Sequence, residues 1–436
     1  MIPVHSLWPD TVQLPSFEPL RSDIKTDILI IGGGLAGILC AFMLQNAGVA
    51  YALVEERKIC SGVTKNTTAK ITVQHGLFCD QMLRTLGAEK TQMYLKANQQ
   101  ALDTYRQLCA GIDCDFEAAG NAVYSLNSYS RLDRELSALH RLGVPAVMME
   151  LLPLPMRTFG AVSVPNQAQF NPLKFIAAIA KELHIYEHTP VLELAPGRAR
   201  TAHGVIHADC IIVATHFPML NKHGSYFLKL YQHRSYVLAL KNASNVQDMY
   251  VDEADKGLSF RSYGDLLLLG GGSHRTGKKG GGWKELHDFA RLHYSEAQVV
   301  CQWATQDCMT LDSVPYIGQY AKHTPGLYVF TGFNKWGMTN AMAGAILLRD
   351  LLLGKQPDWA SVFSPSRSML HPQLAINAAE SSLGLLTPTV PRCPHMGCAL
   401  KYNPQEHSWD CPCHGSRFTN AGKRINNPAT GDMKEK

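Results

Sequence analysis

The sequence predicts an α/β fold in which a Rossmann-like parallel sheet is interrupted by a discontinuous second domain and followed by a small all-β module. Three observations predict it. Near the N-terminus a strand, a glycine turn, a helix and a second strand follow one another. Apolar runs suited to buried strands return at 208–215 and 326–331, after two long excursions. Four of the twelve cysteines then lie within residues 393–413.

Length, composition and charge limit the kinds of protein that this sequence can encode. A chain of 436 residues exceeds what one hydrophobic core usually supports, and 46% hydrophobic residues is ordinary for a globular protein. The net charge of +5 comes from interspersed Lys and Arg, so nucleic acid is not an expected partner. Neither a run of about 18 apolar residues nor a leader pattern is found. We therefore expect a cytoplasmic protein without a transmembrane segment, whose other cysteines are reduced.

Each element follows from local pattern. The opening sheet is predicted at 27–31, 35–48 and 51–55, because an apolar run, a helical segment ending in glycine and a second apolar run follow in order. The glycine-rich segment 270–282 is expected to be a loop, and it could act as a mobile lid. Further helices or strands are expected at 87–111, 121–126, 130–143, 171–183, 191–194, 236–240, 266–269, 283–294, 339–353 and 372–384.

The run IIGGGLAG forms a dinucleotide-binding turn. Gly32, Gly34 and Gly37 have G-x-G-x-x-G spacing, directly after a strand and at the start of a helix. The first glycine allows the tight turn, the second lets the backbone approach a pyrophosphate, and the third lets the helix pack close to the strand. Glu55, at the end of the second strand, is placed to accept hydrogen bonds from ribose hydroxyls. This context favours a dinucleotide site over an unliganded glycine turn, but the motif fits FAD and NAD equally.

Three segments resemble the D-amino-acid oxidase-like superfamily of FAD-dependent oxidoreductases, over roughly residues 25–363. They are IIGGGLAG…VEE, SGVTKNTTAKITVQHG and TLDSVPYIG…GLYVFTGFNKWGMTNAMAG. The resemblance implies FAD as cofactor, with a late glycine turn whose backbone N–H groups stabilise negative charge on reduced flavin. It implies further FAD contacts at Thr64, Thr67, Thr68, Lys70, His75, Val191, Thr215, Gly332, Asn334, Lys335, Trp336, Gly337, Met338 and Thr339. The alternative for the Thr-rich segment is a polar surface loop.

The catalytic residues are not defined by the sequence. Oxidation of an amine by hydride transfer needs a deprotonated amine beside the flavin, which leaves no obligatory side-chain base. Candidates that could face the pocket are His75, Arg261, His274 and Arg275. An arginine would suit a bidentate pair with a substrate carboxylate. The alternative for each is a structural or solvent-facing side chain.

The cysteine-rich end carries two boxes, CPHMGC and CPCHGSRF. Cys393 and His395 form C-x-H, and Cys411 and His414 form C-x-x-H. Two Cys and two His are what a Rieske [2Fe-2S] cluster needs, with thiolates on one iron and imidazoles on the other. A Cys2His2 zinc site is the physical alternative, although this is not zinc-finger spacing.

Both boxes resemble the Rieske family residue for residue, and they resemble its bc1-type electron-transfer branch. That resemblance implies a disulfide between Cys398 and Cys413, although intracellular disulfides are unusual. Two departures stand out. Phe418 occupies the place of a Tyr that bonds a cluster sulfur, which leaves Ser416 as a donor. The module also seems truncated, because only residues 364–392 precede the first box, so we expect the flavoprotein body or self-association to cover the cluster, or an exposed and labile cluster.

The expected domains are an FAD-binding domain at 1–85, 153–222 and 301–363, a substrate domain at 86–152 and 223–300, a linker at 364–392 and the Rieske module at 393–436. We expect an amine or amino-acid-like small molecule to reduce FAD, which passes electrons through the cluster to an unknown acceptor. The substrate class is implied by the resemblance alone. The enzyme would then be a dehydrogenase more than an oxidase. The alternatives are a reductase that runs the relay in reverse and a non-enzymatic redox sensor.

Overall fold

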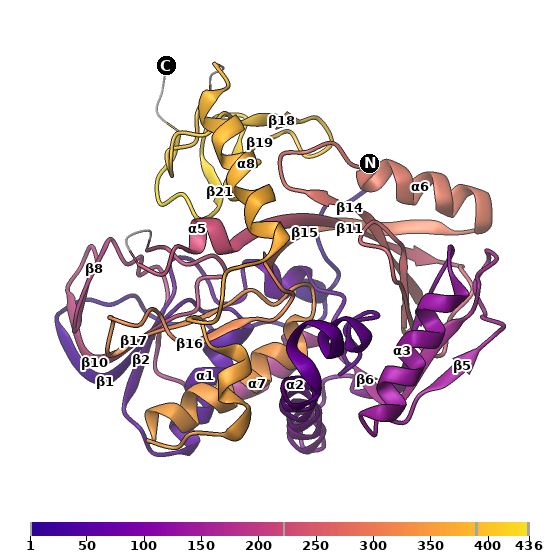
Figure 1. Ribbon diagram of the computed structural model, residues 1–436. Helices are drawn as coiled ribbons and strands as arrows, with labels where there is room; N and C mark the ends of the chain where they lie inside the picture. The colour runs from indigo at the N-terminus through magenta and orange to yellow at the C-terminus, as the bar shows by residue number, and fades with distance from the viewer. Residues whose placement is uncertain (1, 221–222, 389–390, 434–436) are drawn as a thin grey trace.

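The computed structural model describes residues 2–220, 223–388 and 391–433, which form two large sheets and one small one (Figure 1). The first sheet has the order β16-β17-β10-β1-β2-β7, with parallel pairing from β17 to β7. Its strands are β1 (Ile24–Ile31), β2 (Tyr51–Val54), β7 (Ile185–Tyr186), β8 (Glu193–Ala195), β9 (Arg198–Arg200), β10 (Val205–Val213), β16 (Tyr316–Gln319) and β17 (Leu327–Thr331). The predicted α/β class is confirmed.

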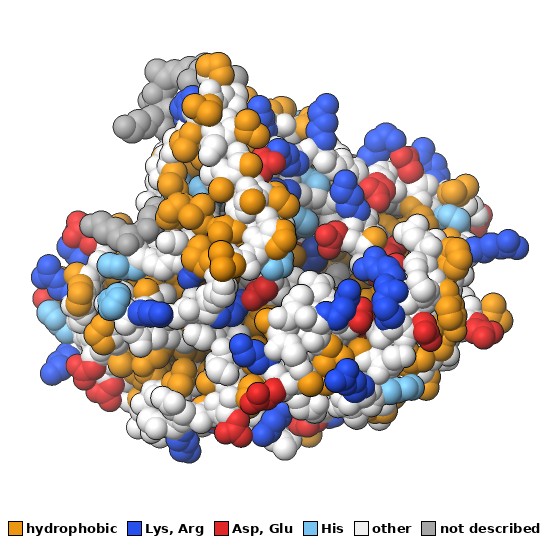
Figure 2. Space-filling model, in the orientation of Figure 1, with side chains coloured by type: hydrophobic (Ala, Val, Ile, Leu, Met, Phe, Trp, Pro, Cys, Tyr) orange, Lys and Arg blue, Asp and Glu red, His pale blue; other side chains and the backbone are white. Residues whose placement is uncertain are grey.

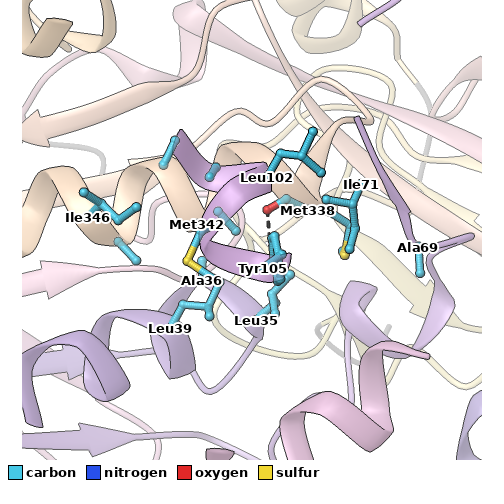
Figure 3. Close-up of a cluster of buried hydrophobic side chains, with 14 of the residues drawn as sticks. Leu35, Ala36, Leu39, Ala69, Ile71, Leu102, Tyr105, Met338, Met342 and Ile346 are labelled. Carbon is cyan, nitrogen blue, oxygen red and sulfur yellow. Dashed lines mark hydrogen bonds between the residues drawn. The ribbon is translucent and has the colours of Figure 1, made fainter. Parts of the chain in front are cut away.

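Helices α1 (Leu35–Asn46) and α7 (Gly337–Leu352) pack against each other on this sheet. Their apolar faces explain why the second half of β1 is completely buried. Figure 3 shows Ala36 and Leu39 of α1 close to Met342 of α7. The Tyr105 hydroxyl donates a hydrogen bond of 3.1 Å to the Met338 carbonyl, which ties a third helix to the start of α7 (Figure 3).

The second sheet is largely antiparallel and has the order β15-β11-β14-β13-β12-β4-β6-β3, with β5 beside β6. It takes in β3, β6 and most of β15, which lie in sequence ranges expected to belong to the first domain. Its strands are β3 (Lys70–Ile71), β4 (Glu117–Tyr124), β5 (Val147–Met149), β6 (Ala161–Gln169), β11 (Leu230–Lys241), β12 (Met249–Asp252), β13 (Ser259–Tyr263), β14 (Leu266–Arg275) and β15 (Gln298–Thr310).

The remaining elements connect or cover the sheets. The helices are α2 (Cys79–Cys109, kinked at Gly87), α3 (Tyr129–Arg141), α4 (Pro172–Ile179), α5 (Tyr226–Lys229), α6 (Gly282–His293) and α8 (Pro372–Leu386), with short 3-10 helices at Trp8–Asp10, Val63–Asn66 and Asp358–Phe363. In the parts of the chain that the structure describes, no helix combines the length and apolar composition needed to cross a bilayer.

The expectation of a loop at 270–282 is wrong for its first half. Strand β14 continues through Arg275 and pairs with β11. The glycines serve close packing here: a Cβ on Gly271 would lie 2.5 Å from Leu258 Cδ2, and one on Gly272 would lie 2.3 Å from the Gly282 carbonyl oxygen. The turn that follows is packed rather than open, since a Cβ on Gly277 would lie 2.6 Å from the Pro412 nitrogen. The structure therefore gives no support to a lid at this place.

The C-terminal module is a four-stranded antiparallel sheet, β18 (Lys401–Asn403), β19 (Ser408–Asp410), β20 (Arg417–Thr419) and β21 (Arg424–Asn426), drawn in yellow in Figure 1. Helix α8 lies beside it, and a Cβ on Gly384 would lie 2.4 Å from Cys413 Sγ. The opposite side of α8 is apolar and exposed, with Leu383 at 61% and Leu386 at 78% (Figure 2). The segment expected as a linker thus covers part of the module.

A buried ion-pair network joins the module to the second sheet. Glu406 accepts hydrogen bonds from Arg234 of β11 (3.0 Å), from Arg417 of β20 (2.8 Å) and from the Tyr236 hydroxyl (2.9 Å). Arg417 also pairs with Asp410 at 2.9 Å. Burial raises the pKa of Glu406, but the guanidinium groups of Arg234 and Arg417 outweigh it and lower the pKa to about 2. The carboxylate therefore stays charged in the folded protein.

Replacing Glu406 with alanine should lower the free energy of unfolding by about 3–5 kcal/mol, because two buried guanidinium groups lose their counter-charge. Urea unfolding measures this, with Glu18→Ala, which removes an exposed pair with Arg21, as a control expected to cost at most about 1 kcal/mol. The Glu406 contribution is present above its unfolded pKa and is lost as the pH falls towards the folded value of about 2. Equal losses in both variants would contradict a coupling role for Glu406.

Candidate functional site

A cavity of about 970 Å³ lies between the two large sheets and is closed in part by the C-terminal module. Most positions expected to contact FAD line it: Gly32, Gly34, Glu55, Thr64, Thr67, Thr68, Lys70, His75, Val191, Thr215, Asn334, Lys335, Trp336, Gly337 and Met338. Three do not line it, and each supports its rim. Gly37 allows close packing of the Gly32 backbone and Gly332 that of the Thr310 side chain, and Thr339 donates a hydrogen bond of 3.0 Å to the Thr72 carbonyl.

The glycine turn has the three roles that its spacing predicts. Gly32 has a φ of +114°, and a Cβ there would lie 2.6 Å from the Ala214 carbonyl oxygen. A Cβ on Gly37 would lie 1.9 Å from the Gly32 carbonyl oxygen. By contrast, Gly34 is extended and borders the cavity, and a Cβ there would approach only Thr64 Oγ1, at 3.4 Å. The backbone at Gly34 is therefore open to a ligand, as a pyrophosphate site requires.

Glu55 is fixed at the same edge of the cavity. Its carboxylate accepts hydrogen bonds from the Gly33 N–H (2.7 Å) and the Arg57 N–H (3.0 Å). Burial raises its pKa, and the two N–H groups oppose that rise. Each carboxylate oxygen keeps a second lone pair, so Glu55 can still accept hydrogen bonds from ribose hydroxyls.

His75 is held by both ring nitrogens. Nδ1 bonds the Tyr94 hydroxyl at 2.7 Å, and Nε2 lies 2.9 Å from the Thr72 carbonyl oxygen and 3.0 Å from Thr339 Oγ1. Its ring stacks on Trp336 with centroids 5.1 Å apart. Burial lowers its pKa to about 3, so the imidazole is neutral at pH 7. His75 thus positions the turn at the start of α7 and carries no charge for substrate binding.

The other three catalytic candidates do not line the cavity. Arg261 is buried and donates hydrogen bonds to the Ala69 carbonyl (3.0 Å) and the Phe170 carbonyl (3.1 Å). His274 stacks on Tyr236. Arg275 points to the module, where it donates to the Pro412 carbonyl at 3.2 Å. None of the three lines the cavity, so none of them is placed to hold a substrate carboxylate.

Sequence reasoning missed the cavity residues of the second sheet. Ser235 of β11 and Thr305 and Asp307 of β15 face the cavity, as does the Arg131–Glu253 ion pair of 2.8 Å. The sequence pattern that could have found the strand residues is the period-two alternation of their side chains. It shows which residues share a face of the sheet, but not what that face borders. Lining residues from the module, at 424 and 426–430, had no local signal.

Side chains of β11 and β15 that point away from the cavity contact the C-terminal module. Gln232 of β11 and Gln306 of β15 point the other way and donate hydrogen bonds to the carbonyls of His414 (2.8 Å) and Gly415 (2.9 Å). The rings of Phe217 and Phe227 lie edge-on to His414, each with a centroid distance of 6.3 Å. The flavoprotein body therefore covers the second box, which was one of the expected ways to complete a short module.

The two predicted histidine ligands lie side by side, and the two predicted cysteine ligands belong to one buried cluster of side chains. The rings of His395 and His414 have centroids 4.9 Å apart, at 85° to each other. Each box makes the same turn: the Gly397 N–H donates to the Cys393 carbonyl, and the Gly415 N–H donates to the Cys411 carbonyl, both at 2.9 Å.

His414 is buried, and neither of its ring nitrogens has a hydrogen-bond partner. An unpaired buried imidazole is costly unless it binds a metal, so the site fits a metal cluster.

The expected Cys398–Cys413 disulfide is not formed. All four cysteines of the module are free, and the sulfurs of Cys398, Cys411 and Cys413 lie within 4.8 Å of one another. Cys413 Sγ instead donates to the Glu380 carbonyl of α8, at 3.6 Å.

Comparisons with known proteins match both the flavoprotein part and the C-terminal module. The model of the FAD dependent oxidoreductase family matches residues 27–351, and that of the Rieske [2Fe-2S] domain matches residues 368–435, beginning inside the expected linker. YhfW of Bacillus subtilis, which is described as a Rieske 2Fe-2S iron-sulfur protein, is 31% identical over 99% of this chain and 97% of its own length. The iron-sulfur subunit 3 of the cytochrome b6-f complex of Nostoc sp. is 31% identical over 21% of this chain and 54% of its own.

Solved structures share the fold of the flavoprotein part. Glycine oxidase from Geobacillus kaustophilus superposes with a TM-score of 0.67 at 19% identity, over 79% of this chain and 99% of that one. L-Proline dehydrogenase from P. horikoshii gives the same TM-score at 17% identity, over 80% and 98%. At these identities the likeness shows the fold alone.

Proposed function

Since the chain belongs to the FAD-dependent oxidoreductase family and ends in a Rieske [2Fe-2S] domain, we propose that it oxidises a small amine or amino-acid-like substrate and passes the electrons from FAD through the cluster to a separate acceptor. FAD accepts two electrons with a hydride and can release them one at a time, and a two-iron cluster carries one. A dehydrogenase that sends its electrons to the cluster uses both groups.

One observation carries this proposal: β11 and β15 present some side chains to the cavity and others to the second cluster box. Ser235 and Asp307 lie on the cavity side of this pair, and Gln232 and Gln306 hold the box on the other side. Asn427 of the module also donates a hydrogen bond to the Phe217 carbonyl at 3.0 Å, beside Thr215 on the cavity rim. The contact of one strand pair with both sites favours internal electron transfer over two independent sites.

The protein groups have defined parts in this reaction. The N-terminus of α7 borders the cavity at Gly337 and would offer backbone N–H groups and positive potential to the negative charge of reduced FAD. Neutral His75 holds that helix start in place through Thr339 and Trp336. The module closes the cavity through Arg424, which pairs with Glu56 at 2.8 Å and restricts water.

An anaerobic absorbance titration with a panel of small amines tests the function. We expect at least one amine to bleach the oxidised flavin rapidly, with no other reductant present. A redox sensor would show no rapid bleaching with any amine, and a reverse relay would need an external reductant. His414→Ala should still bleach at the flavin while lacking the absorbance change of the cluster.

Phe418→Tyr should raise the reduction potential of the cluster. Phe418 is fully buried and packs in one cluster with all four cysteines of the module, so a hydroxyl there can donate to a sulfur and stabilise the reduced state. The gain should be a modest fraction of the roughly 1.5–3 kcal/mol of a hydrogen bond to a charged group, because only its change between oxidation states counts. Potentiometric titration followed by electron paramagnetic resonance measures it, with Phe418→Leu as the donor-free control. An unchanged or lowered potential with ligation intact would place residue 418 away from the cluster.

A further inference from the structure

Asp307 is a carboxylate of the cavity without a partner. It lies in β15 directly opposite His233 of β11, and it lines the cavity beside Thr305. Within the described parts of the chain its carboxylate has neither an ion pair nor a hydrogen bond. Glu253, another carboxylate of the cavity at the second sheet, differs in this respect because it is paired with Arg131 at 2.8 Å.

The position of Asp307 is fixed relative to the glycine turn before α7. The Asn334 N–H donates to the carbonyl of Cys308, the next residue in β15, at 3.1 Å. Asn334 Oδ1 in turn accepts from the Thr310 N–H at 2.8 Å. Asp307 therefore stands at the end of the cavity bordered by this turn, which the family resemblance places beside the flavin.

The groups around Asp307 leave its charge free for a ligand. Burial lowers the pKa of His233 to about 3, so that ring is neutral at pH 7. Lys335 lowers the pKa of Asp307 from a distance, but its Nζ donates to the Asp255 carbonyl at 3.2 Å. Burial raises the pKa of Asp307 to about 6, so it remains largely ionised at pH 7. A partly buried carboxylate without a partner is costly, and a cationic ligand relieves that cost.

We propose that Asp307 binds the substrate amine in its ammonium form, before it loses the proton whose removal hydride transfer requires, and so selects cationic amines over carboxylates at this end of the cavity. This inference rests on the proposed function and narrows its substrate class. An anionic group at the same place would be repelled by Asp307, which makes a simple carboxylic acid a poor ligand. Any carboxylate of an amino-acid-like substrate must point elsewhere in the cavity.

Three probes of matched shape test the assignment: tert-butylammonium, pivalate and tert-butanol. The first has no hydrogen on the carbon next to nitrogen, so it can bind without being oxidised. Perturbation of the absorbance of bound FAD measures each Kd. We expect the wild type to prefer tert-butylammonium, and Asp307→Asn to bind it roughly 10- to 100-fold more weakly. Asp307→Glu should retain the preference. Asp265→Asn, on an exposed pair with Lys241 in the same sheet, should bind like the wild type.

The outcomes separate this inference from the proposed function. A wild type without preference for tert-butylammonium, or an Asp307→Asn variant with an unchanged Kd, overturns the role of Asp307 even if amines reduce the flavin. If Asp307→Asn loses FAD, the role of Asp307 is still tested by the preference of the wild type and of Asp307→Glu for tert-butylammonium. If the protein prefers tert-butylammonium but no amine reduces its flavin, the binding role of Asp307 is supported and amine oxidation is rejected.

Discussion

Gly34→Val should yield a folded chain that has lost its FAD. Gly34 has ordinary extended dihedral angles, and its nearest non-local neighbour, Thr64 Oγ1, would lie 3.4 Å from an added Cβ. The protein thus tolerates the side chain, but the side chain projects into the cavity at the place where backbone must approach the pyrophosphate. Flavin absorbance per chain after desalting, together with thermal unfolding, measures the two effects.

Gly37→Ala is the matched control. Its Cβ would lie 1.9 Å from the Gly32 carbonyl oxygen, so α1 must move away from β1, at a cost of at least about 1–3 kcal/mol. Gly37→Ala should therefore unfold at a lower temperature, whereas Gly34→Val loses the cofactor's stabilisation alone. A Gly34→Val protein that stays yellow after desalting would remove this turn from the FAD site.

Cys411→Ser and His414→Ala should each eliminate the iron–sulfur cluster and leave FAD bound. Each removes one of four ligands. His414 is buried with both ring nitrogens free of hydrogen bonds, so its imidazole is available to bind iron. Iron should fall from about two per chain to a small fraction, since a [2Fe-2S] cluster does not survive with three ligands. Metal analysis and the flavin-to-protein ratio measure both groups.

Cys210→Ser provides the control, because Cys210 is a free cysteine of β10 outside the module. It should keep iron and FAD at wild-type levels. Zinc without iron in anaerobically prepared wild type would reject the Rieske assignment and restore the Cys2His2 alternative.

Local motifs were predictable from the sequence, because their chemistry resides in a few neighbouring residues. The G-x-G-x-x-G turn, Glu55 and the two cluster boxes lie where the spacing places them. The segment 270–282 was not predictable, since the same glycines that favour a loop also permit the close approach of β14 and α6. Only tertiary pairing decides between the two.

The substrate end of the cavity depends on long-range contacts, which a single sequence does not specify. Arg261 looked like a substrate-binding arginine, yet its guanidinium is taken up by backbone carbonyls such as those of Ala69 and Phe170. No local sequence pattern marked Asp307 as a site residue. It is a candidate only because β15 turns its odd-numbered residues to the cavity. The closure of the cavity by the module likewise arises from contacts such as Arg424 with Glu56.

The central claim is that electrons from an amine reach the cluster through FAD. The direct test is an electron paramagnetic resonance spectrum of the wild type after anaerobic incubation with an amine that bleaches its flavin. We predict the signal of a reduced Rieske cluster, absent before the amine is added and absent in His414→Ala. A fully bleached flavin beside a cluster that stays oxidised would contradict the account.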